Sequence, residues 1–370
     1  MKSYKLTITT RALLLTAFLL ILVTGCGKKP EEDHKSNQKK VTVDYSVGLS
    51  DDGTVAGIKA SDYITLGEYQ SIPISSEKVS VTDDMVDRQI DQMMKEYETR
   101  ESLNKDHEIK EGDLVTVSYS GKIKGKGFKG GSKKKFELVV GADSFLTGFD
   151  QQLIGHKRGE TVEVTTAFPE VYPANPKIAG KEVVFRVKII KTEAVVRPKL
   201  TNDFVKKNMS EKGISSISGL KDYVKYELKQ NKTEDAIWSY MITHAMIEKL
   251  PEDKVDVFLK KRVGQMKSQA QEQGYKYSDY LNVYGYNSTK EFQEGIRSKV
   301  EEELEKYLIA DLVAERENLV VTDDDVRDYF KKHPEYSYRK YQKIYGSSYL
   351  KRIVLDDLVI DYLSKRAIIQ

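Results

Sequence analysis

The sequence predicts an α+β protein in which a small antiparallel β-sheet is joined to an all-helical region. Three observations predict this class. Residues 80–104 carry apolar side chains at helical spacing, residues 112–191 alternate with a period of two, and the chain after Pro198 returns to helical spacing. Because the strands are grouped in one stretch and do not alternate with helices, the class is α+β and not α/β.

The first helix is predicted to follow Thr82, whose hydroxyl is a good N-cap. Asp83 and Asp84 stand in the first turn, where the helix dipole favours negative charge. Apolar residues then recur every three or four positions: Val86, Ile90, Met93, Met94 and Tyr97. The pattern indicates one amphipathic helix with a single apolar face.

Four strands are predicted in the period-two stretch, over residues 114–120, 136–140, 161–165 and 183–190. Glycines in the intervening turns separate them: Gly121, Gly125, Gly127, Gly130, Gly131, Gly155 and Gly159. We expect a small antiparallel sheet with one short helix.

The region after Pro198 is predicted to be helical to the last residues. Apolar stripes run through residues 220–245, 255–266 and 292–312, and Pro251 separates the first two. A further helix is predicted after V-V-T-D-D-D-V at 320–326, a phrase that resembles residues 81–86. The two phrases indicate either a duplicated unit or, as we favour, one capping device used twice.

The first residues have the pattern of a secretory signal. Three cations, Lys2, Lys5 and Arg11, precede an apolar run over residues 12–23. As a helix this run would reach about 18 Å, which is short of a ~30 Å hydrocarbon core. V-T-G-C at 23–26 resembles the lipobox of bacterial lipoproteins, which implies cleavage before Cys26 and lipidation of its thiol. An ordinary cleavage site beside a lone thiol is the alternative.

Five segments are expected. Residues 1–25 form a lipoprotein signal peptide, and residues 26–61, which are polar, form a flexible tether. Residues 62–110 supply a connecting strand and helix that pack with the C-terminal domain. Residues 111–195 form the sheet domain, and residues 196–370 form the helical domain.

Charge and cysteine content exclude some partners. The formal net charge is +3, and removal of the three signal cations brings it to zero, since 3 − 3 = 0. This balance does not indicate a nucleic-acid partner. Cys26 is the only cysteine, so no internal disulfide can form.

Motifs for cofactor or metal chemistry are weak. G-K-G-F-K-G at 125–130 matches a phosphate loop, but a strand is predicted after it where a helix N-terminus would be needed. Two S-x-x-K pairs, at 75–78 and 132–135, lack companion motifs. The histidines lie too far apart for a metal site: His34, His107, His156, His244 and His333. We therefore expect no cofactor, no metal, no nucleophile and no acid–base pair.

Several motifs between residues 112 and 189 resemble, in the same order, the peptidyl-prolyl isomerase domain of the FKBP family in its trigger factor version. They are G-D-L-V-T-V-S-Y-S-G (112–121), G-F-K-G-G (127–131), F-E-L-V-V-G (136–141), S-F-L-T-G-F-D-Q-Q-L-I-G-H-K-R-G-E (144–160), F-P-E-V-Y (168–172) and A-G-K-E-V-V-F-R-V-K-I (179–189). The resemblance implies an FKBP-like half-barrel. L-G-E-Y at 66–69, the helix after Thr82 and the region after Pro198 are similar to trigger factor's connecting segment and its C-terminal chaperone domain.

The resemblance also implies a site made of ring side chains. Phe149 would form the floor of a pocket for proline, Phe145 and Leu146 its lip, and the Leu146 N–H would hold the substrate carbonyl. Tyr172 would lie in a loop that covers the proline. Catalytic roles are implied for Tyr119, Phe128, Phe149, Phe185 and Leu146, and substrate-binding roles for Phe136, Phe145 and Tyr172.

Three departures from the family pattern stand out. Lys129 occupies a position where many FKBP members carry a carboxylate, and Phe149 stands where many carry Trp, as is usual for trigger factor. The Gly-Phe-Arg ribosome-docking loop of trigger factor is not found, and the signal pattern stands in its place.

The sequence therefore predicts a lipid-anchored peptidyl-prolyl cis-trans isomerase and folding chaperone at the extracytoplasmic face of the cell membrane. Its expected partners are unfolded or nascent secreted polypeptides with X-Pro bonds and the membrane, without nucleic acid or ribosome. The alternative is a holdase chaperone with little or no isomerase activity. A solute-binding lipoprotein is disfavoured because two repeated βα lobes are absent from the predicted elements.

Overall fold

The computed structural model describes residues 43–170, 172, 176–333 and 336–370. Contacts divide these residues into two compact units: residues 90–217 form a sheet unit, and residues 43–89 with 218–370 form a helical unit. The predicted signal peptide, Cys26 and the first part of the predicted tether lie outside the described residues. No helix of the described part of the chain is long and apolar enough to cross a membrane.

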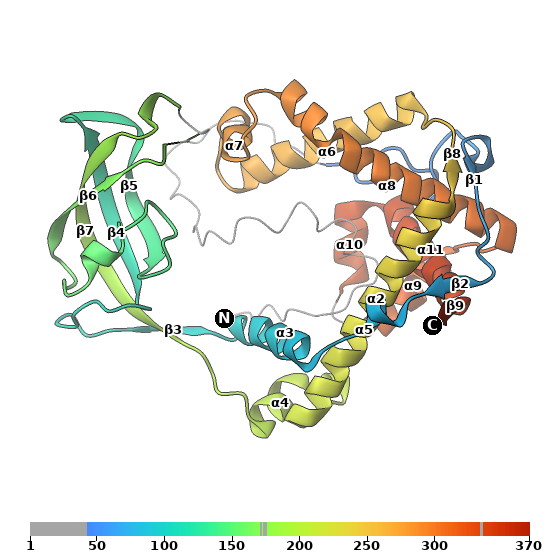
Figure 1. The fold of residues 1–370 in the computed structure, drawn as a ribbon, viewed down its shortest axis with the longest axis horizontal. Helices are drawn as coiled ribbons and strands as arrows, with labels where there is room; N and C mark the ends of the chain where they lie inside the picture. Colours follow the sequence, from blue (N-terminus) through green and yellow to red (C-terminus); the bar gives the residue numbers. More distant parts are fainter. Residues whose placement is uncertain (1–42, 171, 173–175, 334–335) are drawn as a thin grey trace. The chain divides into compact units, whose positions relative to one another are not determined.

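The sheet unit is built on a five-stranded antiparallel sheet (Figure 1), as the period-two pattern predicts. Its strands are β3 (Thr99–Ser102), β4 (Leu114–Ile123), β5 (Lys126–Val139), β6 (Thr161–Ala167) and β7 (Glu182–Val196). One edge of β7 pairs with β4, and its other edge pairs first with β6 and then with β3. All four predicted strands are confirmed, and each is longer than predicted.

The core of the sheet unit lies on one face of the sheet. In β7 every second side chain from Val183 to Ile189 is buried, and the residues between them are half-buried or exposed. Two 3₁₀-helices, η2 (Gln151–Leu153) and η3 (Pro176–Ile178), take the place of the one short helix that was predicted. After β7 the chain continues into α4 (Asn202–Met209) and the 3₁₀-helix η4 (Ser210–Lys212).

The helical unit has one contiguous hydrophobic core. Its longest helices are α5 (Ile217–His244), α6 (Glu252–Glu272), α8 (Thr289–Glu317) and α11 (Ser347–Ser364). α8 contacts both α6 and α11, and its residues from Tyr307 to Ala314 are all buried (Figure 1). The shorter elements are η1 (Ala60–Asp62), α2 (Ser76–Val79), α7 (Tyr277–Val283), α9 (Asp323–Lys332) and α10 (Tyr338–Tyr345), with the small strands β1 (Ile64–Thr65), β2 (Ile72–Ile74), β8 (Met246–Ile247) and β9 (Ala367–Ile369).

The predicted segment of residues 62–110 does not coincide with one of the two compact units. α3 (Asp83–Lys95) begins after Thr82 as expected, but the boundary between the two units falls inside it. Residues 96–110, which were expected to pack with the C-terminal domain, belong to the sheet unit, where β3 lengthens the sheet beside β7.

Residues 43–61 were expected to be part of a flexible tether, but they are folded onto the helical unit. The ring of Tyr45 packs on Tyr345 with 4.7 Å between ring centroids. Gly53 lies so close to α11 that an added Cβ would be 2.6 Å from the backbone nitrogen of Arg352. Residues 43–61 are mostly polar in composition, and only a few apolar residues and glycines make these contacts. The sequence pattern therefore did not indicate that the segment is folded.

A buried group of charges lies beneath this segment. Arg352, whose exposed fraction is 1%, pairs with Asp311 at 2.5 Å and with Asp356 one turn along α11. The backbone N–H of Val55 donates to the second carboxylate oxygen of Asp311 at 2.8 Å. Because buried charges must be paired and hydrogen-bonded, this network ties residues 43–61 to α8 and α11.

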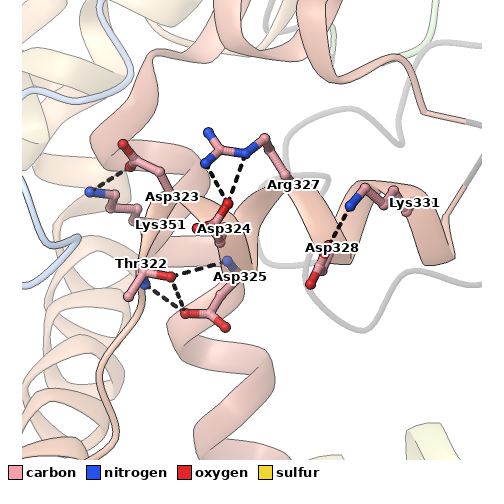
Figure 2. Close-up of polar contacts among 8 residues, drawn as sticks. All are labelled: Thr322, Asp323, Asp324, Asp325, Arg327, Asp328, Lys331 and Lys351. Atoms are coloured by element: carbon pink, nitrogen blue, oxygen red, sulfur yellow. Dashed lines mark hydrogen bonds and ion pairs between the residues drawn. The ribbon is translucent and has the colours of Figure 1, made fainter.

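The start of α9 carries a complete capping box (Figure 2). The N–H of Asp325 donates to the Thr322 hydroxyl at 3.2 Å, and the N–H of Thr322 donates to the Asp325 carboxylate at 2.8 Å. Hydrogen bonds from Thr322 lower the pKa of Asp325. Thr82 receives the equivalent bond from Met85 at the start of α3, at 3.3 Å. Both repeated phrases thus act as helix caps.

One lysine of α6 is buried and forms no ion pair among the residues that the structure describes. Lys261 is 6% exposed, and among the described residues its Nζ has no hydrogen-bond acceptor. The Nζ lies 4.8 Å from the ring centroid of Phe258 and 5.5 Å from that of Tyr349. Burial lowers the pKa of Lys261 to about 8. The charged form therefore destabilises the folded helical unit.

We predict that Lys261→Met raises the free energy of unfolding by about 2 kcal/mol at pH 7. Because the pKa of Lys261 is lower in the folded state than in the unfolded state, the stability of the wild-type protein should rise as the pH increases from about 8 to about 10.5. Chemical denaturation across this pH range measures both effects. A Lys260→Met variant, which changes the neighbouring exposed lysine, is the control, and equal behaviour of the two variants would contradict the prediction.

We also predict that Thr322→Ala lowers the free energy of unfolding by about 1 kcal/mol, because the Asp325 N–H loses its acceptor. Thr322→Ser keeps a hydroxyl at this position and should retain most of the stability. Urea unfolding of the three proteins makes the comparison. If alanine were tolerated as well as serine, the capping box would not stabilise α9.

Candidate functional site

Five aromatic side chains meet on the buried face of the sheet. Tyr119 comes from β4, Phe136 from β5 and Phe185 from β7, while Phe145 and Phe149 come from the segment after β5. The ring centroids of Tyr119 and Phe185 are 5.4 Å apart, and those of Phe149 and Phe185 are also 5.4 Å apart. These spacings are typical of directly packed aromatic pairs. We call these five side chains the ring cluster.

Strand pairing brings the ring cluster together. Gly121 of β4 lies directly opposite Phe185 of β7, and a Cβ at Gly121 would be 2.5 Å from a carbon of the Phe185 ring. The glycine therefore leaves space for the ring to lie across β4, next to Tyr119. Phe149 is 0% exposed and Phe185 1% exposed, so the two rings form the base of the cluster.

Phe145 is partly exposed and packs on all four other rings of the cluster, and its expected place at the lip of the pocket stays a prediction. Its ring centroid is 4.9 Å from Phe149, 5.0 Å from Phe136, 5.2 Å from Tyr119 and 5.7 Å from Phe185. The side chain thus fills the space between the four other rings.

Leu146 follows Phe145 and is buried at 7% exposure. Its carbonyl accepts a hydrogen bond from the Phe149 N–H at 2.9 Å. Its own N–H has no acceptor among the described residues. This N–H is therefore a donor that a bound carbonyl could use, as the resemblance implies.

The segment over residues 141–149 is held by a buried carboxylate. Asp150 is 3% exposed, and one of its oxygens accepts hydrogen bonds from the N–H groups of Gly141 at 2.8 Å and Asp143 at 3.2 Å. Its other oxygen accepts from the Gln151 N–H. Asp150 thereby sets the path of the backbone that presents Phe145 and Leu146.

Two further contacts hold the other end of this segment. The Gln152 side-chain amide donates to the carbonyls of Gly148 and Thr165, each at 2.9 Å, and so links the segment to β6. Gly148 has a φ of 72°, which L-residues with a side chain rarely adopt. No atom lies within 4 Å of the position of a Cβ at Gly148, so backbone conformation and not space explains the glycine.

Phe128 and Tyr172 lie in a second group of rings and not in the ring cluster. Each packs against Phe168, with centroid distances of 5.6 Å for Phe128 and 5.1 Å for Tyr172. Phe168 is 7% exposed. It belongs to the F-P-E-V-Y motif at 168–172, but the sequence did not predict that it forms part of the site. The side chain of Lys129 lies outside what the structure describes.

The chemistry available in the ring cluster is limited. Its side chains are hydrocarbon rings, with one phenol at Tyr119. Among the described residues there is no group of three His, Cys, Asp or Glu side chains that could hold a metal ion. The cluster can exclude water from a bound group and offer it a backbone N–H, but it contains no acid–base pair.

Comparison with protein families covers both units. Residues 105–190 match the profile of the FKBP-type peptidyl-prolyl cis-trans isomerase, and residues 222–365 match that of the bacterial trigger factor C-terminus. The chain combines an FKBP-type domain with a trigger factor C-terminal domain. The FKBP-type domain contains the ring cluster, and the trigger factor C-terminal domain supplies most of the helical unit.

Similar proteins are named trigger factor. The chain is 30% identical over 284 residues to the trigger factor of Limosilactobacillus fermentum, and 30% identical over 278 residues to that of Halothermothrix orenii. These alignments cover 74% and 73% of this chain but 63% of each relative. The chain thus spans 63% of the length of these two relatives.

The comparisons overturn the predicted location. The chain was expected at the extracytoplasmic face of the cell membrane, but its relatives are named trigger factor, a cytoplasmic chaperone that associates with the ribosome, and not membrane lipoproteins. The prediction rested on one apolar run and one cysteine, which are short patterns, whereas the similarity extends over most of the chain. The prediction that the ribosome is not a partner is likewise unsupported by these relatives.

We predict that Asp150→Asn lowers the free energy of unfolding by about 1 to 3 kcal/mol, because the new amide group replaces one acceptor oxygen of a buried side chain and removes hydrogen bonds to the backbone. Glu182→Gln changes an exposed carboxylate of β7 and should cost little. Urea unfolding compares the two variants with the wild-type protein. A stability of Asp150→Asn equal to that of Glu182→Gln would show that the carboxylate does not hold the segment.

Proposed function

We propose that this protein is a chaperone for unfolded polypeptides and that its FKBP-type domain catalyses the cis–trans isomerisation of X-Pro bonds. The observation that carries the proposal is the ring cluster, which lies within the part of the chain that matches the FKBP-type isomerases. The trigger factor C-terminal domain supports the chaperone half of the proposal, since relatives with this domain bear the name of that chaperone.

The chemistry of isomerisation suits an apolar site. Rotation about an X-Pro bond crosses a barrier of about 18 to 20 kcal/mol and takes tens to hundreds of seconds without a catalyst. No covalent bond is made or broken, so a nucleophile is not required. The planar imide is more polar than the twisted one because resonance separates charge. An apolar environment that replaces water therefore favours the twisted state relative to the planar state.

The size of the required effect is modest. If catalysis shortens the time of isomerisation from about 100 s to about 10 ms, the rate rises by about four decades. This corresponds to roughly 5.5 kcal/mol of selective stabilisation of the transition state. Under this proposal Tyr119, Phe149 and Phe185 surround the proline ring, and the Leu146 N–H donates to the substrate carbonyl. Phe128 and Tyr172, which lie with Phe168, would contact substrate residues beside the proline.

Under this proposal Phe145, which is partly exposed, would have to change rotamer for a proline to reach the rings behind it. In the structure its ring packs on four other rings of the cluster, at centroid distances from 4.9 to 5.7 Å. Since aromatic packing of this kind is favourable, the closed arrangement opposes binding. This observation favours a second candidate function, a holdase chaperone whose FKBP-type domain binds chains with little or no proline turnover.

A protease-coupled assay on a short X-Pro peptide separates the two candidates. The isomerase proposal expects turnover by the wild-type protein and a loss of at least about a hundredfold in Tyr119→Ala/Phe149→Ala, because the floor and one wall of the proline site are removed. Far-ultraviolet circular dichroism checks that the variant is folded, and Tyr119→Phe/Phe149→Leu offers a milder change of the same positions. Wild-type turnover no faster than that of the alanine variant, together with suppression of client aggregation by both proteins, would support the holdase.

A further inference from the structure

The face of the sheet opposite the ring cluster is hollowed and positively charged. Two adjoining depressions of about 650 Å³ and 460 Å³ share Ser118, Lys134 and Lys188 in their walls. Ser118 and Ser120 alternate along β4 with Val117 and Tyr119, which point into the core. Because successive side chains of a strand point to opposite faces, the depressions lie on the outer side of the sheet. We call them the basic hollow; its cations include Lys105, Lys134, Arg158, Arg186 and Lys188.

These five cations are not neutralised by neighbouring side chains. All are exposed, and among the described residues none of them forms an ion pair or a side-chain hydrogen bond. Carboxylates do stand near them in the sequence: Asp106 follows Lys105, and Glu137 lies three residues after Lys134, where it pairs with Arg100. Glu160 pairs with His156, and Glu163 stands opposite Arg186 in the strand register without forming an ion pair. Because its lining contains these cations and no acidic residue, the hollow is a region of net positive potential.

The sequence of the adjoining hairpin strengthens this potential. Residues 121–135 contain seven lysines and no acidic residue. They form the end of β4 and the start of β5, and Lys134 of this run lines the hollow. The positive charges of these lysines repel one another unless an anionic partner or salt screens them.

We propose that the basic hollow binds acidic segments of client polypeptides. The inference rests on the proposed chaperone function for the identity of the partner, and it assigns to the FKBP-type domain a second contact surface on the face away from its ring cluster. Carboxylates would pair with Lys134 and Lys188, and the hydroxyls of Ser118, Ser120 and Thr161 would donate hydrogen bonds to them.

The lining of the hollow favours a polypeptide over a nucleic acid. Proteins that bind single strands usually offer aromatic rings on which bases stack. The one ring that borders the hollow is that of Tyr119, and it is 8% exposed and packed within the ring cluster. Hydroxyl groups and the aliphatic Ile190 line the remainder, which suits short acidic side chains and a peptide backbone.

The test is the binding of a fluorescent peptide rich in Asp and Glu and without proline, measured by anisotropy on the full-length protein. Lys134→Gln/Lys188→Gln is expected to weaken binding about tenfold, since two ion pairs are lost. Lys206→Gln/Lys207→Gln, which removes the same charge from exposed positions of α4, should change binding less than about twofold. An increase from low to physiological salt should weaken wild-type binding, because exposed ion pairs are screened.

The outcomes separate this inference from the proposed isomerase. Turnover of an uncharged X-Pro peptide should be unchanged in Lys134→Gln/Lys188→Gln, which also serves as proof that the variant is folded. Wild-type protein that fails to bind the acidic peptide, or equal binding by the two double variants, would overturn the inference whatever the isomerase activity. Tighter binding of a single-stranded oligonucleotide of equal charge, or of anionic vesicles, that is lost in Lys134→Gln/Lys188→Gln would also overturn it.

Discussion

Aromatic packing on one face of a curved sheet is the interaction on which the sheet unit depends. Phe149 and Phe185 are buried almost completely, and they pack against Tyr119 at distances typical of edge-to-face contacts. The same rings fill the core and form the candidate site. A substitution there therefore changes stability and function together, since the energy that closes the sheet also creates the apolar environment that an imide would need. Stability measurements must accompany any test of activity at these positions.

The segment after β5 is held more by hydrogen bonds than by regular structure. Asp150 and Gln152 bind backbone groups at its two ends, and the left-handed conformation of Gly148 completes the turn. Such an arrangement fixes the backbone while leaving the exposed part of Phe145 able to change rotamer.

Charged side chains have two different environments in the two units. In the helical unit Arg352 and its carboxylate partners are buried and paired, and they hold residues 43–61 against α8 and α11. In the sheet unit the cations of the basic hollow are exposed and have no carboxylate partner among the described residues. A formal net charge of only +3 hides this contrast, because composition averages over the whole chain.

The sequence by itself determined the class of the fold, the strands of the sheet and the caps at Thr82 and Thr322, because periodicity and capping are local properties of the chain. It also named all five members of the ring cluster, through a resemblance that rests on motifs in a fixed order. Only the tertiary structure decided that Phe145 packs on the four other rings, that Phe128 and Tyr172 both contact Phe168, and that residues 43–61 are folded. The reason is physical: contacts such as Phe145–Phe185, Phe128–Phe168 and Tyr45–Tyr345 join residues far apart in the chain, and strand pairing and side-chain burial, which a local pattern does not record, set them.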